Sequence, residues 1–148
     1  MNVASALQDA KRIYIDTAPF IYFVERHRGY FTRMFRVIGL IETSPIQAIT
    51  SVLTLTELIV QPLKTGNDDL AKRYRDILVS RDDYTLVTVS ADIAILAGEI
   101  RAQYSLRIAD AIHVATAIAT DCDSILTNDA AMKRLTDLNV LHLDDLEL

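Results

Sequence analysis

Four acidic residues are spaced along the sequence so that they could hold a metal ion together. They are Asp16, Glu57, Asp110 and Asp129. Carboxylates that lie within a few ångströms of one another repel, and one of them takes up a proton unless a cation compensates. A ligand set made only of oxygen favours Mg²⁺ or Mn²⁺ over Zn²⁺. The four acids are therefore candidate metal ligands and candidate catalytic residues.

Each of these acids also has a simpler structural interpretation. Asp16 and Asp129 each stand where a predicted helix begins, and aspartate is a preferred N-cap residue. Glu57 could lie on a solvent-exposed stripe of its helix together with Thr54 and Gln61. One shared site would explain the acids together, whereas the simpler interpretations need a separate reason for each.

Asp110 has the most informative surroundings. It lies within residues 108–120, IADAIHVATAIAT, which have helical spacing and are apolar on almost every side. Such a helix is usually buried, and a buried carboxylate needs a partner, a metal or access to solvent. In the first turn of a helix, the helix dipole also favours its charge.

The histidines and the cysteine give no sign of a zinc site. His27, His113 and His142 have no metal-ligand spacing to one another or to Cys122. His113 follows Asp110 by three residues and shares its helix face. It either supports the acidic site or, as is more usual, is a buried histidine with satisfied hydrogen bonds.

Hydroxyl side chains stand beside two of the acids. Thr17 follows Asp16, and Thr127 precedes Asp129 by two residues, so either threonine could orient a carboxylate or bind a water. The sequence contains no Ser-His-Asp arrangement, no GxGxxG and no glycine-rich phosphate loop. The acids are therefore the main candidates for chemistry.

The elements that must position these residues alternate between strand and helix. Strands are predicted at residues 12–15, 46–50, 85–89, 124–127 and 140–143, and helices at residues 19–25, 30–42, 53–60, 68–80, 92–104, 108–120 and 129–135. Pro62 is expected to terminate the third helix. This alternation predicts one domain over residues 1–148, an α/β/α sandwich of three layers with a mainly parallel central sheet. In such sheets ligands bind beyond the carboxyl ends of the strands, where Asp16 and Asp129 are expected.

Composition narrows the classes of protein without choosing one. The chain has 148 residues, 51% hydrophobic, which suits one domain with a full core. Its formal net charge of −5 gives no support to nucleic-acid binding, although bound metals would supply positive charge where a phosphate sits. A single cysteine, the lack of a signal-peptide pattern and the lack of a long apolar run favour a cytoplasmic protein without a membrane segment.

The four acidic segments together resemble the PIN-domain family. The matching stretches are IDTAPFIYFVE, TSVLTLTELIVQP, LRIADAIHVATAI and SILTND, in this order along almost the full chain. The resemblance implies a Rossmann-like sheet and an endoribonuclease that depends on Mg²⁺ or Mn²⁺ and hydrolyses RNA phosphodiester bonds. Many small members are VapC-type toxins that a cognate antitoxin protein holds inactive, and many form homodimers.

The resemblance also suggests a role for each site residue. Asp16, Asp110 and Asp129 are expected to be the main metal ligands. Glu57 is expected to ligate the metal or to position the attacking water, and Thr127 to support the site by hydrogen bonding. Some members carry a further acid shortly after the last aspartate, where this chain has alanines, and this leaves open whether one or two metals bind.

Three other functions compete with a toxin nuclease. A housekeeping RNA-processing nuclease would use the same site. A catalytically silent PIN module would only bind partners, although the presence of all four acids argues against it. A haloacid-dehalogenase-like phosphatase would carry a second aspartate two residues after Asp16, where this chain has Ala18.

A segment rich in large apolar side chains predicts a partner surface. It comprises Phe20, Ile21, Tyr22, Phe23, Tyr30, Phe31, Met34 and Phe35. Helix geometry cannot direct all of them into one core, so some are expected to form an exposed groove near the active site. Arginines at positions 26, 28, 33 and 36 would flank this groove, and the resemblance implies that an antitoxin segment occupies it.

Overall fold

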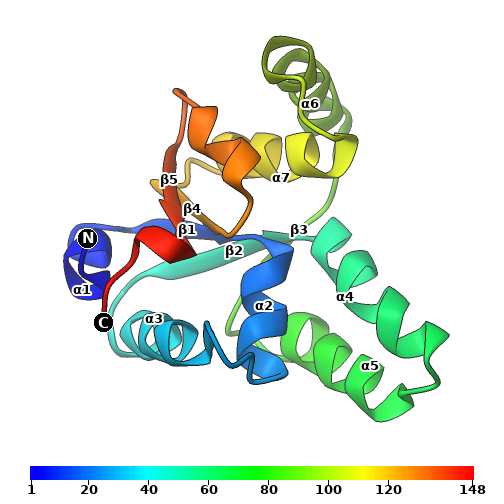
Figure 1. The fold of residues 1–148 in the computed structure, drawn as a ribbon. Coiled ribbons are helices and arrows are strands. Elements are labelled where there is room, and N and C mark those ends of the chain that lie inside the picture. Colours follow the sequence, from blue (N-terminus) through cyan, green and yellow to red (C-terminus); the bar gives the residue numbers. More distant parts are fainter.

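A computed structural model describes all residues of the chain, 1–148, and its centre is a parallel five-stranded sheet (Figure 1). The strands are β1 (Arg12–Ile15), β2 (Gln47–Ser51), β3 (Thr85–Val87), β4 (Ser124–Thr127) and β5 (Asn139–His142). Their order across the sheet is β3-β2-β1-β4-β5, and every neighbouring pair is parallel. The expected parallel sheet is therefore confirmed, with β1 at its centre.

Helices cover both faces of this sheet. They are α1 (Val3–Leu7), α2 (Thr17–Val24), α3 (Phe31–Thr43), α4 (Val52–Lys64), α5 (Asp68–Arg75), α6 (Ala91–Tyr104) and α7 (Ile108–Ala119). Helices α6 and α7 lie on one face, and α2, α3 and α5 lie on the other (Figure 1). The expected α/β/α fold is confirmed. None of the helices combines the length and the apolar character that crossing a membrane requires.

Alternation along β1 divides the core between the two faces. Ile13 and Ile15 pack in the larger cluster with α2 and α3, whereas Tyr14 packs in the second cluster with α6 and α7. Successive side chains of a strand point to opposite faces. The Tyr14 hydroxyl is thereby directed toward α7, the helix that carries Asp110.

Two local predictions about helices were wrong, and one short helix was not predicted. Helix α4 continues past Pro62, which lacks the N–H for one helical hydrogen bond, and ends two residues later at Lys64. Residues 130–134 form a 3₁₀ helix rather than an α-helix. The short helix α1 was not foreseen. It buries Val3 and Leu7 and is held by a parallel bridge between Asn2 and Glu147 near the end of the chain.

Candidate active site

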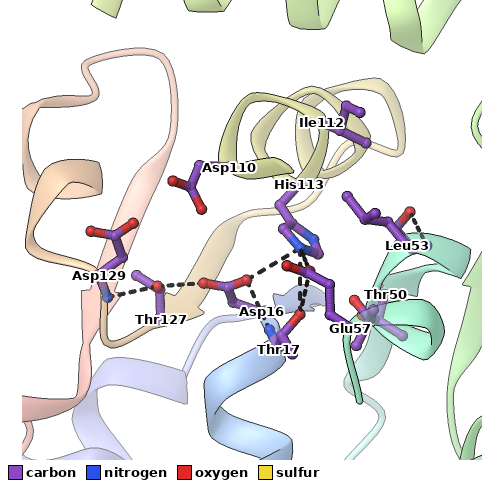
Figure 2. Close-up of polar contacts among 12 residues, drawn as sticks. Asp16, Thr17, Thr50, Leu53, Glu57, Asp110, Ile112, His113, Thr127 and Asp129 are labelled. Carbon is purple, nitrogen blue, oxygen red and sulfur yellow. Dashed lines mark hydrogen bonds and ion pairs between the residues drawn. The ribbon is translucent and has the colours of Figure 1, made fainter. Parts of the chain in front are cut away.

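The four predicted acids line one cavity of about 380 Å³, at the edge of the sheet where β1 and β4 end. The parallel neighbours β1 and β4 bring Asp16 and Asp129 to this edge, and α4 and α7 supply Glu57 and Asp110 (Figure 2). Arg107 also lines the cavity. The fold thus gathers acids that are up to 113 positions apart, since 129 − 16 = 113.

Asp16 both caps a helix and belongs to this cavity, so its two interpretations are compatible. Its Oδ1 accepts a hydrogen bond of 2.8 Å from the Thr17 backbone N–H at the start of α2. Its Oδ2 accepts a bond of 2.7 Å from the Thr127 hydroxyl, which in turn accepts one of 3.0 Å from the Asp129 backbone N–H. Thr127 therefore links the two strand-end acids and fixes the orientation of Asp16 (Figure 2).

Asp129 likewise combines capping with a place in the cavity. Its Oδ1 accepts a 2.9 Å hydrogen bond from the Ala131 backbone N–H, which caps the 3₁₀ helix. Its Oδ2 lies 4.0 Å from Nη2 of Arg107. One oxygen of Asp129 is thus held by the backbone, and the other faces a cation.

Glu57 does not lie on the solvent-exposed stripe that was one interpretation of its position. Thr54, which would share that stripe, is fully buried. The Glu57 Oε1 atom accepts hydrogen bonds from Nε2 of His113 at 2.6 Å and from the Thr17 hydroxyl at 2.8 Å. Partial burial raises the pKa of Glu57, but the hydrogen bond and charge of His113 outweigh this effect, and the pKa falls below its usual value.

Asp110 is 7% exposed and is paired with Arg107, a partner that the sequence analysis did not predict. The Arg107 Nε donates a 3.0 Å hydrogen bond to Oδ2 of Asp110. The spacing of three residues at the start of a helix was the available signal, since side chains three apart share a helix face. The Arg107 side chain is 82% exposed, so this pair is open to solvent on one side.

Metal-free protein should become more stable when Asp110 is replaced by asparagine. Burial raises the pKa of Asp110, the hydrogen bond from Arg107 opposes this, and the charges of Asp129 and Asp16 raise it further, leaving the pKa above its usual value. An acid with a raised folded-state pKa loses stability as pH rises from its unfolded pKa through its folded one. At pH 7 we expect Asp110→Asn to raise the melting temperature by roughly 2–4 °C, measured by calorimetry with EDTA present. A clear fall would identify Asp110 as a structural hydrogen-bond acceptor.

The cavity suits a hard divalent cation in the chemistry of its donors. Four carboxylates from separate elements provide the oxygen ligands that Mg²⁺ and Mn²⁺ prefer. The side chains are not closed around a common point, because no three His, Cys, Asp or Glu residues are arranged to hold a metal as they stand. Arg107 instead places its positive charge beside both Asp110 and Asp129. Binding of a metal by these two acids would require Arg107 to move, and its high exposure permits that.

The sequence of this chain belongs to the PIN domain family, whose model matches residues 13–138. A sequence comparison with curated proteins gives no significant match. The matched segment contains all four acids of the cavity, so the resemblance expected from the sequence is confirmed.

Solved structures share this fold at low sequence identity. VapBC2 from Rickettsia felis, bound to a promoter DNA fragment, is similar with a TM-score of 0.70 and 18% identity over 88% of this chain and 98% of that one. A toxin–antitoxin complex from Klebsiella pneumoniae is similar with a TM-score of 0.68 and 23% identity, over 88% of this chain and 97% of that one. VapC20 of Mycobacterium tuberculosis, a toxin that cleaves the sarcin-ricin loop, is similar with a TM-score of 0.69 and 15% identity, over 86% of this chain and 98% of that one.

Proposed function

We propose that this protein is a metal-dependent endoribonuclease and the toxin of a toxin–antitoxin pair. The observation that carries the proposal is the convergence of Asp16, Glu57, Asp110 and Asp129 on one cavity at the carboxyl edge of the sheet. Membership of the PIN family, a family of nucleases, supports phosphodiester hydrolysis. The fold shared with toxins of toxin–antitoxin complexes supports the toxin role over housekeeping RNA processing.

In this proposal each acid has a defined task. Asp16, Asp110 and Asp129 supply the negative oxygens that hold Mg²⁺ or Mn²⁺. Glu57 has one oxygen occupied by His113 and Thr17, which leaves the other to contact the metal or the attacking water. When bound, the metal would polarise the phosphoryl oxygen and lower the pKa of a bound water. Thr127 keeps Asp16 in place through its hydroxyl.

The proposal is tested by incubating the purified chain with a mixture of structured and single-stranded RNAs. We expect cleavage with Mg²⁺ or Mn²⁺, no cleavage with EDTA, and recovery when metal is restored. DNA of the same sequences serves as the control substrate. A folded chain that leaves every RNA intact with either metal would instead support a silent, partner-binding module.

Replacement of Arg107 by glutamine should increase the affinity for Mn²⁺. The guanidinium neutralises the acids that the metal would bind, so the two cations compete for the same carboxylates. We expect a dissociation constant lower by about threefold to tenfold, a modest change because Arg107 is exposed and its pairing is worth little. Titration calorimetry with Mn²⁺ measures it, and Arg81→Gln, outside the cavity, is the control. A weaker affinity in Arg107→Gln would show that the arginine supports the metal instead.

The large apolar side chains that were predicted to form one groove occupy different places in the structure. Phe35 is 64% exposed and lines an apolar cavity of about 590 Å³ with Leu40, Arg36 and Leu148. Phe20, by contrast, is buried in the core. Ile21 and Tyr22, two other members of the predicted segment, line the acidic cavity, and no residue lines both cavities. The predicted side chains are thus divided between the acidic cavity and a separate apolar one.

We assign the apolar cavity lined by Phe35, Leu40 and Leu148 to the antitoxin, and we call it the groove on α3. Phe23, Phe31 and Phe35 form a ladder in which successive ring centres are 5.9 Å apart, and Arg26 lies over the Phe31 ring. An exposed apolar strip edged by arginine suits a helix with an apolar face and acidic flanks. A second copy of this chain, as expected for a homodimer, is the alternative occupant.

A further inference from the structure

We infer that Tyr14 and His113 are positioning residues that hold the Glu57 carboxylate in the orientation needed at the acidic cavity. The inference rests on the proposed nuclease function and concerns side chains that do not line the cavity themselves. It is carried by a continuous chain of hydrogen bonds from the central strand, through α7, to α4.

This series of hydrogen bonds begins at the backbone and ends on a carboxylate oxygen. The Ser51 backbone N–H donates to the Tyr14 hydroxyl oxygen at 3.2 Å. The Tyr14 hydroxyl lies 2.6 Å from Nδ1 of His113, and Nε2 of His113 lies 2.6 Å from Oε1 of Glu57. Figure 2 shows the His113 ring pointing from α7 toward Glu57 and Thr17. Tyr14 is 0% and His113 is 1% exposed, so water does not compete for these bonds.

The direction of each bond follows from the donors available. The ionised Glu57 carboxylate can only accept, so Nε2 of His113 must carry a hydrogen. When His113 is neutral, its Nδ1 has no hydrogen, and the Tyr14 hydroxyl donates to it. Neutral His113 is then the tautomer with hydrogen on Nε2, the nitrogen that faces Glu57. The charged imidazolium also carries hydrogen there, so Glu57 receives a bond in either state.

This chain fixes which oxygen of Glu57 is available for chemistry. His113 and Thr17 both bind Oε1, which removes rotation of the carboxylate and leaves Oε2 for the cavity. Asp16 and Asp129 are oriented by backbone groups at the starts of helices. Glu57 lies in the second turn of α4, where no free backbone N–H can do the same. The tyrosine and the histidine supply the orientation that the backbone cannot.

Packing alone gives no reason for these polar residues. Tyr14 and His113 lie among the buried side chains between the sheet and α7. An apolar pair of similar volume would fill this space without burying polar atoms. A buried network with every member satisfied restricts its residues to one arrangement, and here that arrangement ends on a candidate catalytic acid.

The inference is tested by a double-mutant cycle on RNA cleavage. The variants are His113→Leu, His113→Gln and Tyr14→Phe, each made alone and with Glu57→Gln. We expect His113→Leu to lower kcat by about 10–100-fold with little change in KM, the loss typical of residues that orient a ligand. Glutamine at position 113 should restore part of the activity, because its amide can still donate to Oε1. In the Glu57→Gln background, His113→Leu should have a much smaller effect, since most of its action passes through Glu57. The remainder would come from Asp16, whose Oδ1 lies 3.6 Å from Nε2 of His113.

The matched control is Tyr74→Phe, which removes another buried tyrosine hydroxyl that donates to a carboxylate, that of Glu25. It should leave kcat unchanged. If His113→Leu lowers kcat equally with and without Glu57, or if glutamine is no better than leucine, His113 is merely structural and the inference fails.

A second measurement separates the hydrogen-bond chain from the nuclease function. Imidazole ¹⁵N spectra of the wild-type chain should show His113 with hydrogen on Nε2 that exchanges slowly with solvent. Tyr14→Phe should shift the Nδ1 resonance of this ring. An unchanged spectrum in Tyr14→Phe would overturn the inference even if RNA is cleaved, whereas the expected spectrum without RNA cleavage would overturn the proposed function alone.

Discussion

Asparagine in place of Asp16, Asp110 or Asp129 should reduce metal-dependent RNA cleavage to below about 1% of wild type. Each substitution removes a negative oxygen from the set that would bind a hard cation. Residues that only orient a ligand cost about 10–100-fold when they are changed, and loss of the ligand itself is expected to exceed this. Initial rates on one RNA substrate, measured over a range of Mg²⁺ concentrations, give the result.

These three variants should remain folded, which makes the result interpretable. Asparagine is as good an N-cap as aspartate, so Asp16→Asn keeps the start of α2. Asp121→Asn is the matched control, because Asp121 is exposed outside the cavity and has a positive φ of 56°, which asparagine also tolerates. It should cleave RNA like the wild type. A folded Asp110→Asn protein with wild-type activity would remove the cavity from consideration as the active site.

The sequence predicted the place of the strand-end acids because that prediction needs only the order of elements. Once residues 12–15 and 124–127 are recognised as parallel strands, Asp16 and Asp129 must lie at the same edge of the sheet. The apolar surroundings of Asp110 similarly required a special partner. These arguments depend on patterns over a few residues, and the structure has the strands and helices close to where those patterns put them.

The side-chain partners of the acids could not be predicted in the same way. The bond between Tyr14 and His113 joins residues 99 positions apart, and that between Glu57 and His113 joins residues 56 apart. Such pairs depend on how α7 packs against the sheet, which no local pattern records. One signal was available for Tyr14. It is two residues before Asp16, which follows the strand directly with an extended backbone, so both side chains point to the same face.

The second large effect that we expect concerns the groove on α3. A change in this groove should weaken a complex between the protein and the product of a small neighbouring gene. Co-expression should yield a complex in which RNA cleavage is suppressed. Phe35→Asp should weaken this complex by roughly 10–100-fold, because burial of a phenylalanine side chain contributes about 1.5–3 kcal/mol and a buried charge would oppose binding further. Size-exclusion chromatography and titration calorimetry would measure the loss, and cleavage should reappear in the mixture.

The same substitution should leave the free protein as stable as the wild type, because Phe35 is 64% exposed and contributes little to the core. Ile95→Asp is the matched control, since Ile95 is 62% exposed on α6, a helix on the opposite face of the sheet. It should not affect the complex.

If Phe35→Asp melts far below wild type, the ring belongs to the core and not to a docking surface. If the complex tolerates Phe35→Asp, or if the chain stays free of the neighbouring gene product, the groove does not bind an antitoxin. If this chain forms a dimer and Phe35→Asp dissociates it, the groove binds a second copy of the chain. A groove that is permanently covered in a dimer cannot also bind an antitoxin.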